Sequence, residues 1–349
     1  MKNLSWFNKL MFFLNIVLTV STFVAYILPF LAPKVFPILS VLTLFMPLFF
    51  VLNGLFFVYW GLQFKKRMIL SGLVLLMGIT FINKFYKFSG KDYPVDDKDF
   101  TVMSYNVRLF NVFKWVERDD IPDNILGFIN EKNPDILCVQ EYSNSANMDL
   151  KLYPHRYIFM DGNQIKTGQA IFSKFPIINE GKILFPNSNN NVVFADIKRG
   201  TDIIRVYNMH LQSIKISPDV NEIDENIDAI NQGGKSQKLL NRISKAFMQQ
   251  QQQAELFKEH KKDCPYPVII CGDMNNSAFS FVYRDIKGKL KDTFEEAGKG
   301  FGATYKFRYY PARIDYIFTD NTMKVKSFEN FPDFVNSDHF PIMTRLSME

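Results

Sequence analysis

Long apolar segments occupy the first quarter of the chain, and shorter ones alternate with polar stretches in the remainder. The long segments are residues 11–31, 35–62 and 68–83. As a helix, the 21 residues of the first would be about 31 Å long, which is enough to cross a bilayer. The second is longer and the third, with 16 residues, is marginal. The pattern predicts an all-α region with about three transmembrane helices within residues 1–89.

The remainder alternates between strand-like and helix-like patterns after a polar linker, residues 90–98. Strand patterns occur at residues 100–107, 135–139, 170–172, 191–198, 202–210, 268–272, 314–319 and 340–346. Helical patterns occur at residues 123–131 and 238–260, and the glutamines at 249–253 are predicted to form a solvated helix face. Residues 213–236 are a polar insertion, interpreted either as a mobile loop beside the site or as a plain surface loop. The alternation predicts an α/β sandwich over residues 99–349.

Charge is divided as sharply as hydrophobicity. Residues 1–90 contain eight Lys or Arg and no Asp or Glu, whereas the rest contains 33 basic and 35 acidic residues. The formal net charge of +6 therefore belongs to the apolar region and is no indication of DNA binding.

The positions of the basic residues also predict an orientation. Lys2 and Lys9 precede the first apolar segment, and residues 65–67 are Lys-Lys-Arg between the second and third. Such groups favour the cytoplasmic side of a membrane. Three spans then place residues 90–349 outside, so we expect an integral protein of the bacterial inner membrane with an extracytoplasmic C-terminal domain. If the third segment does not span, that domain faces the cytoplasm. The expected partner is the lipid bilayer, and no protein partner can be inferred.

Six short polar motifs follow the strand patterns. They are Ser104-Tyr105-Asn106, Gln140-Glu141, Asn208-Met209-His210, Gly272-Asp273-Met274-Asn275, Arg313-Ile314-Asp315-Tyr316 and Ser337-Asp338-His339. Carboxylates, amides and imidazoles that converge from separate strands can bind a divalent cation and a phosphate group. Burial of Glu141 at a strand end would favour a cation partner, although a surface turn explains this residue equally well.

Asp273 and Asn275 are two positions apart and share one face if the chain is extended there. A carboxylate can orient or deprotonate a water, and the amide can hold that water or a phosphate oxygen. The alternative is a turn whose side chains bond to the local backbone.

Two of the four histidines, His210 and His339, lie within the motifs. A carboxylate such as Asp315 behind His339 would fix its tautomer and favour the protonated form, which suits phosphate binding. His210 is placed to bind the same phosphate or to protonate the leaving group. A single histidine at a strand end is more often structural, and it is the pair that favours catalysis.

The motifs and their order resemble the endonuclease/exonuclease/phosphatase superfamily, the deoxyribonuclease I-like proteins, over residues 98–347. The resemblance implies a four-layer sandwich of two packed mixed β-sheets flanked by helices, with the site at one edge. It implies Mg²⁺, with Mn²⁺ as an alternative, bound by Asn106, Glu141 and Asp338. Asp273 and Asn275 are available for a second ion. It also implies catalytic roles for His210, Asp273, Asn275, Asp315 and His339.

These observations predict a membrane-anchored, metal-dependent hydrolase of phosphodiesters or phosphomonoesters. A nuclease would be expected to present a basic track, whereas an anchor near lipid headgroups favours a phospholipid or sphingolipid substrate. A catalytically silent scaffold would be indicated by loss of Glu141, Asp273 or His339, and all three are present. Thr304 and Arg313 are candidates for substrate contact, and no acidic partner of His210 can be assigned.

Overall fold

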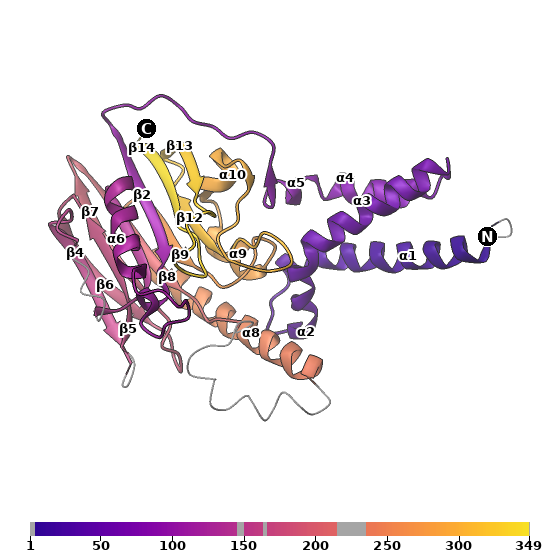
Figure 1. Cartoon of the computed structure of the whole chain (residues 1–349), viewed down its shortest axis with the longest axis horizontal. Helices are drawn as coiled ribbons and strands as arrows, with labels where there is room; N and C mark the ends of the chain where they lie inside the picture. Colours follow the sequence, from indigo (N-terminus) through magenta and orange to yellow (C-terminus); the bar gives the residue numbers. More distant parts are fainter. Residues whose placement is uncertain (1–3, 145–149, 163–165, 215–234, 349) are drawn as a thin grey trace.

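The computed structural model describes residues 4–144, 150–162, 166–214 and 235–348, and it shows an elongated helical region projecting from an α/β domain (Figure 1). The helical region consists of α1 (Trp6–Ile27), η1 (Leu28–Phe30), α2 (Pro37–Ser40), η2 (Val41–Phe45), α3 (Met46–Leu62), α4 (Met68–Met77) and α5 (Ile79–Ile82). Helices α1 and α3 run antiparallel, and α4 packs against both.

Polar side chains join these helices in an otherwise apolar interior. The amide of Asn15 donates to Ser71 Oγ on α4 (2.7 Å) and accepts from Trp60 Nε1 on α3 (3.1 Å). Asn53 of α3 donates to Thr22 Oγ1 of α1 (3.0 Å). Hydrogen bonds of this kind are typical of helices that associate in lipid, where apolar burial gives little driving force.

Two helical segments, Trp6–Phe30 and Pro37–Leu62, are long and apolar enough to span a bilayer. Only 28% and 33% of their most apolar windows are buried, and the exposed faces carry large apolar side chains such as Phe13, Val20 and Leu55. The third predicted segment contains the shorter helix α4, which is separated from α5 at Gly78. The chain then returns to the α/β domain, where Lys84 Nζ donates to the carbonyl of Ala278 (3.3 Å).

The helical region is fixed to the domain by polar and apolar contacts. The backbone N–H of Lys34 donates to Gln251 Oε1 (2.9 Å), and Tyr310 donates its hydroxyl to the carbonyl of Leu44 (3.3 Å). Phe279 of the domain packs in one apolar cluster with Tyr26 and Phe50. Residues 90–98 follow the domain surface after a short β-pair, β1 (Tyr86–Lys87) with β11 (Gly300–Phe301).

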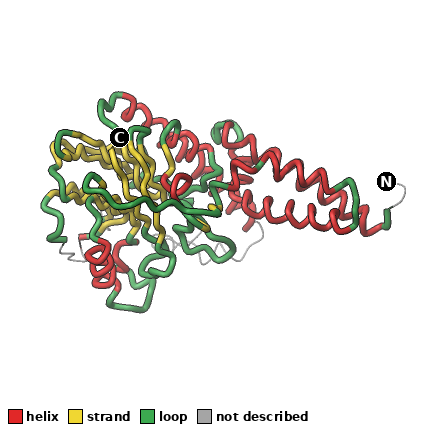
Figure 2. The backbone as a smooth tube through the Cα atoms, turned by 90° about the horizontal axis from the view of Figure 1, so that it is seen from above, coloured by secondary structure: helices red, strands yellow, loops and turns green. Residues whose placement is uncertain are grey.

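The domain contains two six-stranded sheets that pack face to face (Figure 2). The first has the order β13-β14-β2-β3-β5-β4, and the second has the order β10-β12-β9-β8-β7-β6. Strand bounds in the first sheet are β2 Asp99–Asn106, β3 Ile136–Tyr142, β4 His155–Asp161, β5 Thr167–Ser173, β13 Met323–Asn330 and β14 Ile342–Met348. In the second they are β6 Ile177–Leu184, β7 Asn191–Arg199, β8 Asp202–His210, β9 Val268–Asp273, β10 Lys291–Asp292 and β12 Asp315–Thr319. Pairs β2–β3 and β8–β9 are parallel and the other neighbours antiparallel, so both sheets are mixed.

The main core lies between the sheets, where Val102 and Ile171 of the first belong to one apolar cluster with Val206 and Ile269 of the second. Helix α6 (Ile121–Lys132) covers the outer face of the first sheet. Helices α8 (Lys235–Lys262) and α9 (Phe281–Lys287) cover the second. Short helices η3 (Arg108–Asn111) and α10 (Thr293–Ala297) complete the described helices of the domain. The predicted four-layer α/β sandwich is thus confirmed.

The prediction of a solvated glutamine face on α8 is wrong. Gln250, Gln251 and Gln253 are buried. Gln250 Nε2 donates to the carbonyl of Gln212 (2.7 Å), and its Oε1 accepts from Asn276 Nδ2 (2.7 Å). Because helix α8 lies between the domain and α2, this face is covered and its amides bind loop backbone instead of water. Of the predicted insertion, residues 215–234 lie outside the described residues.

Candidate active site

The motifs meet because the strands that carry them end at one edge of the sandwich. His210 at the end of β8 is opposite Asp273 at the end of β9, and Asp273 is opposite Asp315 at the start of β12. In the other sheet, Asn106 is opposite Gln140. The carboxyl ends of the parallel pairs therefore place Glu141, His210 and Asp273 around one space, and His339 reaches it from the segment before β14.

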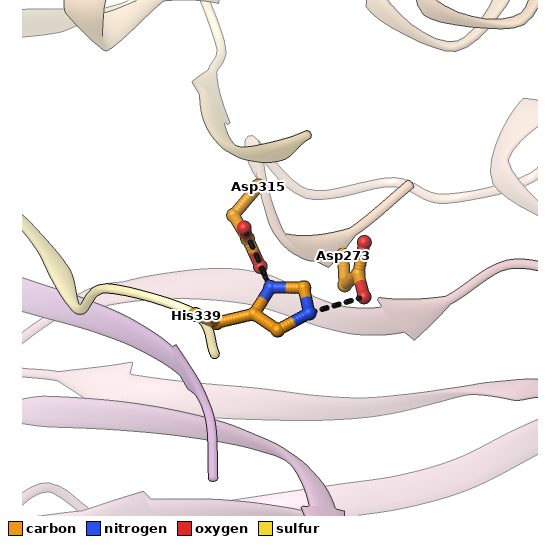
Figure 3. A group of neighbouring side chains, drawn as sticks. All are labelled: Asp273, Asp315 and His339. Carbon is orange, nitrogen blue, oxygen red and sulfur yellow. Dashed lines mark hydrogen bonds and ion pairs between the residues drawn. The ribbon is translucent and has the colours of Figure 1, made fainter. Parts of the chain in front are cut away.

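His339 lies between two carboxylates (Figure 3). Its Nδ1 is 3.0 Å from Asp315 Oδ2, and its Nε2 is 3.6 Å from Asp273 Oδ2. Burial alone would lower the pKa of His339, but Asp315 and then Asp273 outweigh it and raise the pKa well above its usual value. The expected orientation by Asp315 is thus present, and the imidazole is held in its protonated form.

Asp273 is buried at the centre of the site. Its Oδ1 accepts from the backbone N–H of Asn275 (2.7 Å), and its Oδ2 accepts from Asn106 Nδ2 (3.1 Å). Burial raises the pKa of Asp273 to about 6, with His339 opposing and Asp315 adding to the rise. Asp273 therefore titrates close to neutral pH, which is where a carboxylate that exchanges a proton with water is most useful.

Glu141 lies on the cavity side of Asn106. Its Oε1 accepts from Asn106 Nδ2 (3.1 Å) and lies 3.7 Å from His210 Nε2, which is also 3.6 Å from Asp273 Oδ2. Among the described residues, the acidic neighbours of His210, which the sequence did not reveal, include the two central carboxylates. Asp338 pairs with Arg108, whose Nη1 lies 3.1 Å from Asp338 Oδ2.

The backbone at this edge is held in rarely used conformations. Glu141 and Asn275 have positive φ angles of 50° and 49°. Gly272 has φ 135°, and a Cβ atom there would lie 2.0 Å from the carbonyl oxygen of Met209. Such strain is tolerated where the fold must aim particular side chains, and it is common at active sites. The turn after β9 is thus built to direct Asp273 and Asn275 into the site.

The catalytic candidates line a cavity of about 1300 Å³ between the domain and the helical region. Glu141, His210, Asp273, Asp338 and His339 all contribute to its wall. Part of the opposite wall comes from η2 and α3.

Over residues 103–339, the sequence matches the profile of the Endonuclease/Exonuclease/phosphatase family. The chain belongs to this family. Residues 8–85 match a second profile, a domain of unknown function. No match is found among curated proteins.

Solved structures of the endonuclease/exonuclease/phosphatase fold resemble the domain. They include D. rerio TDP2 humanized by 14 mutations, with 16% identity, a TM-score of 0.54, and coverage of 72% of this chain and 100% of that chain. The human Nocturnin catalytic domain with a bound sulfate anion has 19% identity, a TM-score of 0.52, and coverage of 74% and 98%. A family member from Bacteroides vulgatus has 20% identity, a TM-score of 0.52, and coverage of 72% and 99%. At these identities the likeness concerns the fold.

Two groups of side chains in this family member are candidates for a metal centre. Donor atoms of Asp273, Asp315 and His339 all lie within 4.8 Å of one another. In this group both ring nitrogens of His339 face carboxylates, with Nδ1 3.0 Å from Asp315 Oδ2 and Nε2 3.6 Å from Asp273 Oδ2. The second group is Asn106 with Glu141 and Asp273, where one amide nitrogen bonds both carboxylates. The carboxylate oxygens of Glu141 and Asp273 are hard donors that fit Mg²⁺, and a cation there would offset their crowding. Asn106 turns its Nδ2 to them, and its Oδ1 accepts from the backbone N–H of Arg108 (3.0 Å), so the amide oxygen does not face the carboxylates in this structure.

Several residues that contribute to the site were not identified from the sequence. Arg108 holds Asp338, and Tyr305 packs edge-on against His339, with ring centres 5.0 Å apart. Arg108 is two positions beyond Asn106, so its position beside the motif was a usable signal. Thr304, which the sequence indicated as a candidate for substrate contact, is instead fully buried, and its Oγ1 accepts from the backbone N–H of Asp315 (3.0 Å), so it positions that residue.

Proposed function

We propose that the protein is a membrane-anchored, Mg²⁺-dependent hydrolase of phosphate esters. The observation that carries the proposal is the convergence of two histidines and two carboxylates, His210, His339, Glu141 and Asp273, on one cavity. Membership of the endonuclease/exonuclease/phosphatase family supports the same chemistry.

The position of each residue in the site indicates its role in the reaction. When bound by Glu141, with Asp338 available from the same cavity and the amide oxygen of Asn106 available after rotation of that side chain, Mg²⁺ would supply Lewis-acid polarisation of a phosphoryl oxygen. Asp273, ionised above pH 6, accepts a proton from a water that Asn275 helps to hold. Water attacks phosphorus in line, and one P–O ester bond breaks.

The histidines act on the phosphate and the leaving group. His339, protonated and oriented by Asp315, donates a hydrogen bond to a phosphate oxygen and offsets the charge that develops there. His210 faces the same space from β8 and can bind a second oxygen or give a proton to the departing one. The products are an alcohol and a phosphate with one ester bond fewer.

Nuclease activity is the alternative function within the family. One structural neighbour is D. rerio TDP2 complexed with a single-strand DNA product, with a TM-score of 0.53 and 16% identity. In the present chain the two arginines among the described cavity residues are both paired, Arg108 with Asp338 and Arg313 with Asp292 (2.6 Å). A basic track for a nucleic-acid backbone is therefore not supported by these side chains.

We also propose that the helical region spans the membrane and that the domain is extracytoplasmic. The start of α1 and the turn at residues 63–67, which carries Lys65, Lys66 and Arg67, lie at the end of the bundle farthest from the domain (Figure 1). If that basic end stays in the cytoplasm, the domain lies on the other side of the bilayer.

The experiment uses the full chain in detergent with bis-p-nitrophenyl phosphate. Wild-type protein should hydrolyse it with Mg²⁺ and not with EDTA, and His339→Ala should lower the rate by about 100-fold or more. His155→Ala, in edge strand β4, is the matched control and should retain the rate. Hydrolysis that survives His339→Ala would overturn this assignment of the site, and an inactive wild-type protein would support a silent scaffold.

A further inference from the structure

The cavity has two chemically different ends. One end carries the catalytic carboxylates and histidines. The other is lined by apolar side chains of η2 and α3, namely Leu44, Phe45, Leu48 and Val51. A water-soluble phosphate ester has no need of the second end, whereas an amphipathic molecule matches both.

We propose that the substrate is a membrane phospholipid. Its phosphate ester reaches Glu141, His210 and His339 while its hydrocarbon part lies against η2 and α3. This inference rests on the proposed phosphoesterase function and specifies the substrate class of that same site. Water attacks phosphorus, one P–O ester bond breaks, the leaving oxygen takes a proton, and a phosphate monoester and an alcohol result.

The apolar end belongs to the segment that is long and apolar enough to cross a bilayer, Pro37–Leu62. Leu48 and Val51 line the cavity and are 48% and 57% exposed, so their apolar side chains are accessible to a molecule that binds there. If this segment spans the membrane as proposed, acyl chains surround it, and the hydrocarbon part of a bound lipid would lie beside them.

The apolar wall is also fixed in place relative to the catalytic residues. Tyr310 OH donates to the carbonyl of Leu44 (3.3 Å), and Val41 packs with Ile243 and Phe247 of α8. Helix α8 in turn bonds the loop after β9, because Gln250 Nε2 donates to the carbonyl of Asn275 (3.2 Å). The membrane segment is thus part of the substrate cavity and does more than tether the domain.

The charge of the cavity lining and its aromatic residues are consistent with a lipid substrate. Its two arginines are neutralised by Asp338 and Asp292, and no lysine is among the described residues that line it. Phe307, Tyr309 and Tyr310 also line the cavity, Tyr310 donates to the carbonyl of Leu44 in η2, and Tyr309 is 78% exposed. Aromatic side chains of this kind are typical of the headgroup level of a bilayer.

The test compares a lipid with a soluble ester. The full chain is reconstituted in vesicles of equal parts phosphatidylglycerol, phosphatidylethanolamine and sphingomyelin. Mass spectrometry follows the loss of each lipid and both its products, and bis-p-nitrophenyl phosphate is assayed in parallel. We expect Mg²⁺-dependent loss of at least one lipid, and abolition of that loss by His339→Ala.

The matched variants are Val51→Trp and Val20→Trp. Both valines are 57% exposed in apolar helices, but only Val51 lines the cavity. Val51→Trp should lower the ratio of lipid rate to soluble-ester rate by about tenfold. Val20→Trp should leave both rates unchanged. The ratio corrects for any loss of folded protein.

Two results would overturn the inference while the proposed function stands. One is hydrolysis of the soluble ester, or of supercoiled plasmid, with no loss of any vesicle lipid. The other is an unchanged rate ratio in Val51→Trp. If neither the soluble ester nor any lipid is hydrolysed, the phosphoesterase function itself fails and the lipid inference fails with it.

Discussion

At the residue scale, several carboxylates of the site lie close together in a buried environment. Asp273 and Asp315 are buried, and Glu141 and Asp273 both lie within 3.7 Å of His210 Nε2. Crowded carboxylates favour protonation of their neighbours and binding of a cation. The cost of holding Asp273 ionised without a metal leads to a first prediction.

Asp273→Asn should stabilise the metal-free protein at alkaline pH. The folded-state pKa of Asp273 is raised to about 6 from a usual value of 3.8. The carboxyl therefore adds stability below pH 4 that is lost as the pH rises through 6. In EDTA at pH 8 the free energy of unfolding of the variant should be about 3 kcal/mol higher than that of wild type. Near pH 4 the two free energies of unfolding should be equal. Thermal unfolding at both pH values measures this, and a variant less stable at pH 8 would contradict it.

Asp315→Asn should narrow the pH range of activity. Asp315 is the carboxylate that does most to raise the pKa of His339, so its removal lowers that pKa. The protonated imidazole is then lost at a lower pH, and the alkaline limb of the rate profile should move downwards. The rate at the optimum should fall about 100-fold or more because the imidazole loses its orientation. A lower rate with the alkaline limb in place would show that Asp315 acts only on structure.

The part of the site that could be predicted from the sequence consists of residues within short motifs next to strand patterns. Four of the six motifs lie at the ends of strands, whereas residues 313–316 and 337–339 lie at or just before the starts of β12 and β14, and the structure gathers all six at one edge. Thr304 supports Asp315 from eleven positions away through a backbone N–H, and a fully buried threonine in a loop carries no sequence signal for that role. The interaction of Arg313 with Asp292 likewise depends on tertiary packing, and it leaves Arg313 paired within the wall.

At the scale of elements, the sequence pattern predicted the central strands of each sheet but did not predict these edge strands. Strands β4, β6 and β13, which the pattern did not predict, each lie at the edge of a sheet. Most of their side chains are only partly buried, so they lack the continuous apolar run that marks β3 or β9. The prediction of a solvated glutamine face on α8 was wrong for the opposite reason. Polar residues can be buried when the backbone of a loop supplies their hydrogen bonds.

Gln250→Ala tests that buried face. The change removes hydrogen bonds to the carbonyls of Gln212 and Asn275 and leaves a void, so the free energy of unfolding should fall by about 2–3 kcal/mol. The rate should fall as well, because the loop that carries Asn275 loses a support. Gln252→Ala, at an exposed position in the same run, is the control and should change neither. Equal unfolding curves for the two variants would show that the buried bonds add nothing.

At the scale of the whole molecule, the apolar helices and the sandwich form one unit around the cavity. Hydropathy predicted the apolar segments, and strand pattern predicted the sandwich. Their docking was not predictable, because it depends on isolated contacts such as Tyr310 with Leu44 and Phe279 with Tyr26. Under the proposed topology, the two ends of the bundle lie on opposite sides of the bilayer.

The proposed topology predicts where the C-terminus lies. An alkaline phosphatase moiety fused after Glu349 should be active in a bacterial host, because that enzyme matures only outside the cytoplasm, whereas a fusion at the turn after Gln63 should be inactive. Replacing Lys65, Lys66 and Arg67 by Gln should weaken this difference. Activity only in the fusion after Gln63 would place the domain in the cytoplasm.

The central claim is that this cavity hydrolyses phosphate esters with a cation bound beside Glu141. Its most direct test is the rate of bis-p-nitrophenyl phosphate hydrolysis by the full chain, measured against Mg²⁺ concentration for wild type and Glu141→Ala. We predict a saturable dependence on Mg²⁺ in the wild type and a rate at least about 100-fold lower in the variant. Hydrolysis that is independent of metal, or equal in the two proteins, would contradict the claim.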